Sequence, residues 1–421
     1  MNMGGLLVRL ARPMAVLFIG GIALVPGRSD GYPWMIRHDY TGCAVCHVDP
    51  SGSGLLTQYG RAQGELLLLT QYSPPPAGQE REPGRLANFL WGALDGAHIP
   101  DWLLLGGSFR GAVLGNKLVS NDVGFPNPAW NVQYVQMQAD LYAGVSIGHF
   151  RADGSIGVLP TGGYPAIITN IGSWNLVSRQ HWIGYEFGDN AFLLRAGRIN
   201  LPFGLRNIEH TSWVRRSTRT DINSFQQDGV AFSYAGDKWR GELMAILGNF
   251  QITPIFREYG YSGYAELSLT KNAAIGASSL LTYAKRDIVL KAGPPGNEFS
   301  PSNLRQAHGL FARYSPVRLL VLLAEWDFLV QSPFGSPAYL GYAGFLQGDV
   351  EIIQGVHLFE TVELFRDRTD GATPSYAFWL TPNWFFAPHA DIRLDLFLQR
   401  QVEVRGSATA IGFVAMLHFY L

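Results

Sequence analysis

The chain has 421 residues, a formal net charge of -1 and 15% charged residues, well below the ~25% usual in soluble proteins. The near-neutral charge excludes a basic nucleic-acid-binding surface, and no interior stretch supplies the ~18 apolar residues of a transmembrane helix. Aromatic residues reach 13%, and glycine occurs 49 times. These features favour an all-β protein, either a transmembrane β-barrel, whose strands are apolar on one face only, or a large secreted protein.

Residues 1–29 are predicted to be a signal peptide. Arg9 and Arg12 form a short basic region, and residues 14–25 (MAVLFIGGIALV) form an apolar run that is too short to span a bilayer as a helix. We place the start of the mature chain within residues 27–32. The protein is therefore expected to be exported, and an exported barrel belongs in the outer membrane of a Gram-negative cell.

Residues 30–72 contain both cysteines of the chain, in the motif Cys43-Ala-Val-Cys46-His47. This C-x-x-C-H pattern is the attachment motif of a c-type haem. Two thiols at this spacing reach the two vinyl groups on one porphyrin edge, and the histidine that follows becomes an axial ligand of the iron. We therefore predict one covalent haem c, attached through Cys43 and Cys46, with His47 on the haem iron.

Three other uses of the motif are less consistent with the sequence. A structural zinc site needs four ligands, and the chain has no second cysteine pair. A redox-active dithiol of the thioredoxin type would lie in an alternation of strands and helices, which the surrounding residues do not show. A disulfide between Cys43 and Cys46 would close a strained loop and would not require His47.

The second axial position of the iron has several candidates. His38 is preferred, with Met35 behind it, because both lie shortly before the motif. An open position is also consistent with the sequence, and three more distant histidines stay candidates: His98, His149 and His181.

The haem segment is too short to be an independent domain, because chains below about 40 residues rarely fold without support. Within it, residues 55–69 are expected to form one short helix. We predict that the segment packs into the periplasmic mouth or the lumen of the barrel and acts as a plug. Residues 73–101, which include SPPPAGQEREPGR, are predicted to be a linker.

Residues 102–421 are predicted to form an antiparallel barrel. Apolar and polar side chains alternate in residues 134–142, 263–270 and 389–400, as in strands with one apolar face. Some segments, such as 318–330 and 349–366, exceed the ~5–6 residues usual in soluble proteins. At about 20 residues for each strand and turn, the region holds about 16 strands.

Two further features favour a membrane barrel over a secreted sandwich. The apolar alternation continues to the last residue, Leu421, which resembles the insertion signal of outer-membrane barrels. Aromatic residues near segment ends are predicted to form the interfacial girdles. They are Trp182, Tyr185, Trp213, Tyr261, Tyr264, Trp379 and Trp384.

The whole architecture resembles the fused outer-membrane monohaem cytochrome c–porins that are associated with extracellular ferrous iron oxidation. Residues 43–63 (CAVCHVDPSGSGLLTQYGRAQ) and 194–207 (LRAGRINLPFGLRN) carry the resemblance, together with the order of signal peptide, haem motif and barrel. Only the two cysteines and the histidine of the motif carry over by position.

The resemblance implies electron transfer across the outer membrane, from an extracellular metal or other redox donor to a soluble periplasmic cytochrome or similar carrier. Electron flow in the opposite direction would use the same parts. Whether the protein is an enzyme that oxidises ferrous iron or an electron carrier stays open.

Two alternatives remain. The chain could be a substrate-specific porin, with the haem segment as a structural plug or redox gate, or a barrel that sheathes a separate multihaem cytochrome. In the porin hypothesis, basic side chains in the lumen could form a path for anions. Such side chains can also be latches against lumen carboxylates. They are Arg195, Arg198, Arg215, Arg216 and Arg219.

Overall fold

The computed structural model describes most of the chain after the expected signal peptide. The described residues are 33–40, 42–70, 82–94, 99–121, 129–160, 169–171, 174–206, 212–291, 298–369, 373–403 and 406–421. The signal peptide and the first part of the predicted linker lie outside these ranges.

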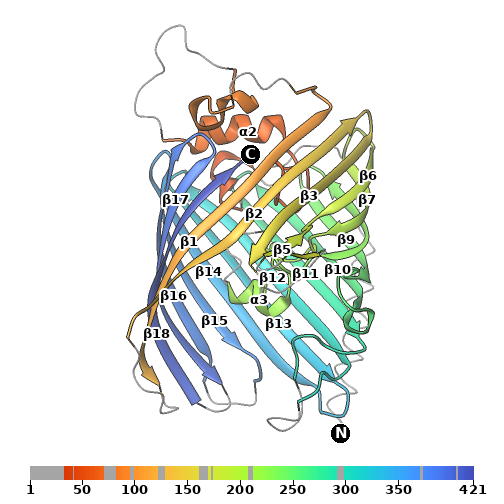
Figure 1. Cartoon of the computed structure of the whole chain (residues 1–421), viewed down its shortest axis with the longest axis vertical. Coiled ribbons are helices and arrows are strands. Elements are labelled where there is room, and N and C mark those ends of the chain that lie inside the picture. Colours follow the sequence, from red (N-terminus) through yellow and green to blue (C-terminus); the bar gives the residue numbers. More distant parts are fainter. Residues whose placement is uncertain are drawn as a thin grey trace.

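Antiparallel strands form a closed barrel, shown in Figure 1, in which β1 pairs with both β2 and β18. The wall has 16 strands, as predicted, because β5 continues into β6 along the edge of β3, and the short β4 pairs only with β5. The wall thus has no exposed strand edge, which is the requirement for a sheet in lipid.

The strands follow one another in chain order. They are β1 (Leu103–Asn121), β2 (Asn131–Ile147), β3 (Phe150–Pro160), β4 (Thr169–Ile171), β5 (Trp174–Val177), β6 (His181–Phe187), β7 (Phe192–Ile199), β8 (Gln227–Ala235), β9 (Trp239–Gly248), β10 (Glu258–Thr270), β11 (Ala273–Ala284), β12 (Asn303–Val317), β13 (Leu320–Pro333), β14 (Tyr339–Ile353), β15 (Val356–Arg366), β16 (Ser375–Ala387), β17 (Ala390–Glu403) and β18 (Gly406–Tyr420).

The predicted alternation is confirmed along these strands. On β17, Ile392 and Leu396 point outward and are 46% and 42% exposed. Asp391, on the same strand, points inward and is buried. One predicted segment was wrong: residues 349–366 are two strands. The chain reverses after Ile353 because Gly355 adopts a positive φ of 78°, which suits a tight turn.

The prediction of aromatic girdles was partly wrong. Tyr185 and Trp384 do face outward. Trp182 and Tyr264 instead point into the barrel, where each ring lies against an arginine, and Trp213 lies on a helix inside the lumen. The alternation shows that residues share a face, but it does not show which face is the outer one.

The two ends of the barrel differ. At one end, where the C-terminus lies, the connections are short turns. They join β2 to β3, β6 to β7, β8 to β9, β10 to β11, β12 to β13, β14 to β15, and β16 to β17. Most connections at the opposite end are longer, and one of them, between β7 and β8, spans 200–226. We call the first end the short-turn end.

Two segments enter the barrel. From the short-turn end comes the N-terminal segment, which holds η1 (Pro33–His38), α2 (Gln58–Gln63) and η2 (Gly64–Leu68); η3 (Leu86–Trp91) follows in the predicted linker. The predicted helix within 55–69 is thus confirmed as α2 and η2. From the other end, the β7–β8 connection, here called the insert, brings α3 (Trp213–Thr218) into the lumen. A further one-turn helix is η4 (Pro254–Phe256).

No helix in the described ranges is long and apolar enough to cross a membrane.

The lumen contains an apolar core, to which both segments contribute. Met35 and Ile36 of η1 are buried in one cluster with Phe203 and Val214 of the insert and with inward side chains of the wall, among them Met244. A water-filled channel would leave inward residues wet. Here the two segments fill the space, so burial of apolar surface holds them in place.

A buried ion pair latches η1 to the wall. Arg37 donates to both the carboxylate and the backbone carbonyl of Asp349 on β14, and its Nη1 donates to Glu351 Oε2 at 3.2 Å. The side chains of Arg37 and Asp349 have no exposed surface. His357 contacts the same aspartate, with 3.0 Å between Nδ1 and Oδ1. Removal of one partner of such a pair leaves a buried charge without compensation.

We expect Arg37→Ala to loosen the N-terminal segment, because breaking a buried ion pair costs about 3–5 kcal/mol. Chymotrypsin should cleave the folded variant within 33–70 at least tenfold faster than the unchanged protein. Arg85→Ala is the matched control, since the Arg85–Glu82 pair is exposed and worth ~0–1 kcal/mol. Equal cleavage rates for Arg37→Ala and the control would show that the latch does not hold the segment.

Candidate cofactor site

The C-x-x-C-H motif forms a compact turn inside the mouth of the barrel. The His47 N–H donates to the Cys43 carbonyl at 2.9 Å, and the Thr57 N–H donates to the Cys46 carbonyl at 2.9 Å. Cys43, Cys46 and His47 are all buried, and both cysteines are thiols. The turn therefore holds two thiols and an imidazole in a buried environment.

Helix α2 packs directly against this turn. Thr57 caps the helix, because its Oγ1 accepts the Gly60 N–H at 3.0 Å, and the same hydroxyl donates to the Val45 carbonyl at 2.5 Å. At Gly60 a Cβ would lie 2.1 Å from the Cys46 carbonyl oxygen. Only glycine allows the helix backbone to come this close to the motif.

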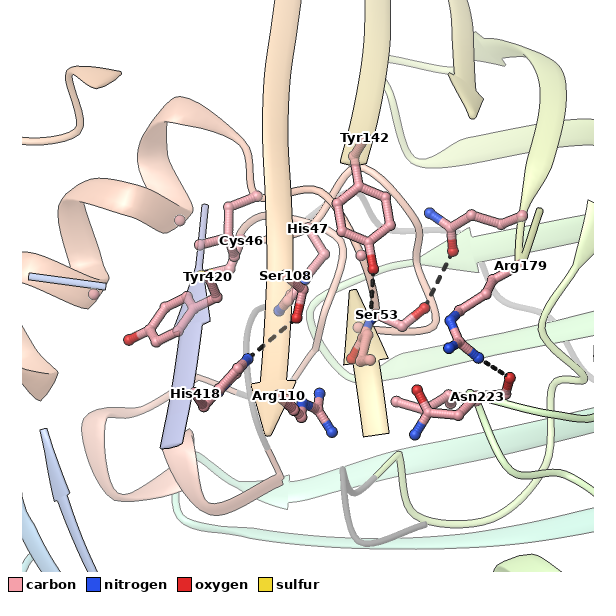
Figure 2. Close-up of a pocket in the computed structure, with 18 of the residues that line it drawn as sticks. Cys46, His47, Ser53, Ser108, Arg110, Tyr142, Arg179, Asn223, His418 and Tyr420 are labelled. Atoms are coloured by element: carbon pink, nitrogen blue, oxygen red, sulfur yellow. Dashed lines mark hydrogen bonds between the residues drawn. The ribbon is translucent and has the colours of Figure 1, made fainter. Parts of the chain in front are cut away.

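A cavity opens beside the motif. Met35, Cys46 and His47 line it from the N-terminal segment, and Figure 2 shows Tyr142 and His418 of the wall around it. The insert completes the lining with Ile222 and Asn223. Residues of the N-terminal segment, the wall and the insert therefore meet around one space.

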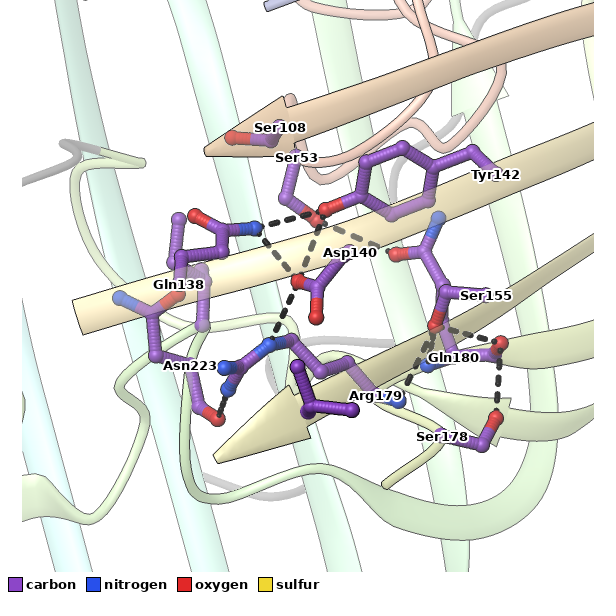
Figure 3. A network of polar contacts seen from close by, with 12 residues as sticks. Ser53, Ser108, Gln138, Asp140, Tyr142, Ser155, Ser178, Arg179, Gln180 and Asn223 are labelled. Carbon is purple, nitrogen blue, oxygen red and sulfur yellow. Dashed lines mark hydrogen bonds and ion pairs between the residues drawn. The ribbon is translucent and has the colours of Figure 1, made fainter. Parts of the chain in front are cut away.

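A polar network forms one side of the cavity (Figure 3). Asp140 Oδ2 accepts from Gln138 Nε2 at 2.7 Å, from Tyr142 at 3.1 Å and from Arg179 Nε at 2.7 Å. Arg179 also donates to the Asn223 carbonyl, which ties the wall to the insert. Nothing in the sequence alone linked these strands to the motif, because their side chains meet only when the barrel closes.

Buried charge fixes the motif to the wall. Asp49, two residues after His47, accepts from Arg195 Nη1 on β7 at 2.8 Å, and Arg195 Nη2 donates to Glu242 on β9 at 2.6 Å. Burial opposes the charged form of Asp49, but Arg195 and then Ser51 outweigh it and hold the pKa of Asp49 below its ordinary value. The aspartate is therefore an anion that locks the loop after the motif.

The imidazole of His47 is neutral at pH 7. Burial lowers the pKa of His47 to about 4, against the smaller opposing influences of the Asp49 charge and a hydrogen bond with the Gly54 backbone. Neutral imidazole is the form that binds metals. Among the described residues no group of three or more His, Cys, Asp or Glu side chains could hold a bare metal ion.

The candidates for the second axial position are separated by the structure. Met35 lines the cavity and is 2% exposed. His38, the preferred candidate, lies away from it, with Nδ1 3.4 Å from Arg318 Nη2. His149 and His181 lie on exposed surface outside the lumen. His98 lies outside the described residues.

Sequence reasoning missed His418, which lines the cavity from β18 (Figure 2). Its Nδ1 lies 2.9 Å from Asp391 Oδ2, and its Nε2 lies 3.3 Å from Ser108 Oγ. The alternation at the C-terminus already separated His418 from the apolar positions such as Leu417 and Phe419. That pattern could have placed it in the lumen.

Solved structures share the fold of this chain, although no family model and no curated protein matches its sequence. OmpT of Vibrio cholerae has 11% identity and a TM-score of 0.56, over 77% of this chain and 99% of that chain. The anion-selective porin of Comamonas acidovorans has 11% identity and a TM-score of 0.54, over 76% and 99%. OprB of Pseudomonas putida has 12% and 0.51, over 75% and 94%.

The barrel has the fold of outer-membrane porins. At these identities the similarity concerns the fold alone. The matched share leaves about a quarter of this chain uncovered.

The lumen arginines proposed as an anion path are mostly latches. Arg195 joins Asp49 to Glu242, Arg215 bonds Glu325, and Arg219 joins Glu258 to Asp287. Arg198 donates to Asn249 and to a backbone carbonyl. Arg216 is exposed on α3. Four of the five therefore hold protein segments together inside the barrel.

We expect Gly60→Ala to displace α2 from the motif, because the new Cβ would overlap the Cys46 carbonyl. In protein prepared without added cofactor, the buried thiols of Cys43 and Cys46 should react with a maleimide about tenfold faster in the variant. Gly348→Ala is the control, since a Cβ there meets only Leu322 at 4.0 Å. A variant whose thiols react no faster than the control would refute the close packing.

Proposed function

We propose that this protein lies in the outer membrane and carries one covalent c-type haem that passes electrons across that membrane. The haem would be held by thioether bonds from Cys43 and Cys46, with His47 as axial ligand. The observation that carries the proposal is the cavity beside the motif, lined by Cys46, His47 and Met35.

The residues around the cavity fit a haem c in their chemistry. Two thiols and a neutral imidazole are the groups that would attach and ligate the cofactor. Cys46 and His47 line the cavity, and Cys43 is buried in the same motif without lining it. Met35 adds a thioether, a common partner of histidine in c-type cytochromes. When bound, the haem would supply reversible one-electron exchange at its iron.

The chain's own residues provide the protein part of such a site. The turn of the motif fixes the distance between Cys43 and His47, and the Asp49–Arg195 pair anchors it to the barrel wall. The insert and the wall keep bulk water away from the cavity. The exclusion of water and the charged groups around the cavity would set the reduction potential of an enclosed cofactor.

The ends of the barrel suggest the direction in which the site faces. In outer-membrane barrels the short turns face the periplasm and the longer loops face outward. The N-terminal segment lies at the short-turn end, where Gln354 in the β14–β15 turn donates to the carbonyls of Leu66 and Leu69. The haem would thus be reached by a soluble periplasmic electron carrier, with an extracellular metal or other redox donor on the far side.

A substrate-specific porin is the second candidate, and the shared fold favours it. One solved structure of the same fold is an anion-selective porin. In that case the N-terminal segment would be a plug or a redox gate. Two observations argue against an open channel. Inward side chains such as Arg313 and Glu325 are buried, and Arg215 of the insert forms an ion pair with Glu325.

We expect purified protein in liposomes to pass electrons but few ions. With an electron acceptor trapped inside, external ferrous iron should reduce the haem and then the acceptor. Conductance in planar bilayers should be at least tenfold below that of a general porin of the same strand number, because two segments fill the lumen. Cys43→Ala/Cys46→Ala should abolish covalent haem and electron transfer while the barrel still folds.

The opposite pattern would favour the porin. Protein without covalent haem, or with haem that exchanges electrons with neither side, together with steady anion conductance, would refute electron transfer. Barrel folding in every variant is checked by the change in gel mobility on heating.

We expect Met35→Ala to remove a sulfur ligand from the haem iron. The ferric spectrum should lose the long-wavelength charge-transfer band of methionine ligation, and the ferric form should be favoured at least tenfold, because His/Met ligation raises the potential. His38→Ala is the matched control and should change neither property, since its ring lies away from the cavity. A spectrum altered only in His38→Ala would reverse this assignment.

A further inference from the structure

Arg110 is a buried cation without a carboxylate partner. It lies on β1, is 7% exposed and lines the cavity beside His47. Its Nε has no hydrogen-bond partner, and among the described residues Arg110 forms no salt bridge. Arg195, Arg215 and Arg219 in the same lumen are each paired with carboxylates.

An unpaired charge in a dry interior is costly, so buried arginines normally meet an anion. Gln138 and His418 lie opposite Arg110 on the adjacent strands. The carboxylates of the neighbouring strands already have other partners: Asp140 accepts from Gln138, Tyr142 and Arg179, and Asp391 lies 2.9 Å from His418. Arg110 also faces the cavity, where a ligand could supply the anion. Arg110 therefore points to a ligand that carries negative charge.

Arg179 provides a second donor to the same cavity. Its Nε is bonded to Asp140 and its Nη1 to the Asn223 carbonyl, whereas Nη2 is buried and has no partner. The residue is 6% exposed. Because Asp140 already compensates its charge, Arg179 offers a fixed hydrogen-bond donor and little net charge.

The two guanidinium groups lie apart from the motif. In the view of Figure 2, Arg110 lies below Cys46 and His47, and Arg179 lies to their right. A haem c has the same polarity: its two thioether bonds lie on one edge of the porphyrin, and its two propionate carboxylates lie on the opposite edge.

We infer that Arg110 and Arg179 bind the propionate carboxylates of the haem, with Arg110 as the main charge partner. The inference rests on the proposed function, and it assigns the cofactor's orientation in the cavity. Arginine suits this task because its planar donors match a carboxylate in a bidentate contact.

The first test is the midpoint potential of the holo-protein. Loss of a cation beside a propionate favours the more positive ferric form, so Arg110→Gln should shift the ferric/ferrous equilibrium about tenfold toward ferric, equivalent to about 59 mV for one electron. Arg110→Lys keeps the charge and should restore most of the shift. Arg400→Gln is the matched control. It removes an equal charge near the end of β17, from a residue that does not line the cavity.

The second test pairs the arginine with the cofactor's carboxylates. Haem and its dimethyl ester are titrated into the Cys43→Ala/Cys46→Ala variant, with and without Arg110→Gln. With Arg110 present, haem should bind at least tenfold more tightly than the ester. In the Arg110→Gln background the two affinities should become nearly equal, which a merely structural role of Arg110 would not produce.

The outcomes separate this inference from the proposed function. Wild-type protein without haem would overturn both. Haem that is present, with a potential and an ester preference unchanged by Arg110→Gln, would overturn the propionate assignment alone. Arg110→Gln could instead change anion selectivity in bilayers and leave the haem potential unchanged. Arg110 would then serve the passage of solute anions, and the inference would be overturned. A variant that fails to fold is replaced by Arg110→Lys and Arg179→Gln in the same two tests, which must then show the smaller shifts expected of them.

Discussion

The requirement that charges inside the barrel be compensated there is the constraint on which the rest of this structure depends. Asp49 of the N-terminal segment meets Arg195, which also meets Glu242, and none of the three side chains is exposed. Since water cannot replace a missing partner, each charge fixes the position of another segment. The motif is thus held in place by the wall, although the segment is too small to hold itself.

The cavity is a product of two segments that enter from opposite ends. The N-terminal segment contributes Met35, Cys46 and His47, and the insert contributes Ile222 and Asn223. Neither segment lines this cavity by itself. A porin fold, which ordinarily surrounds water, here surrounds an apolar core and a cavity lined by Cys46 and His47.

Local pattern predicted the parts of this fold that depend on neighbours in sequence. The alternation in residues 389–400 predicted a strand, and residues 55–69 were predicted to contain a short helix, as found. Which face of a strand meets the lumen depends on register across the whole barrel. Trp182, predicted for the outer girdle, therefore points inward, and His181, a candidate axial ligand, points outward. Met35, Arg110 and His418 come together only through contacts distant in sequence, which no local pattern contains.

The seam of the barrel runs through the site. Ser108 and Arg110 lie on the first strand, His418 and Tyr420 lie on the last, and all four line the cavity. One wall of the pocket therefore does not exist until β18 pairs with β1, which is the step that ends barrel assembly. Maturation of the site and biogenesis of the membrane protein are in this way a single event, and a chain whose seam stays open has the motif but not the pocket.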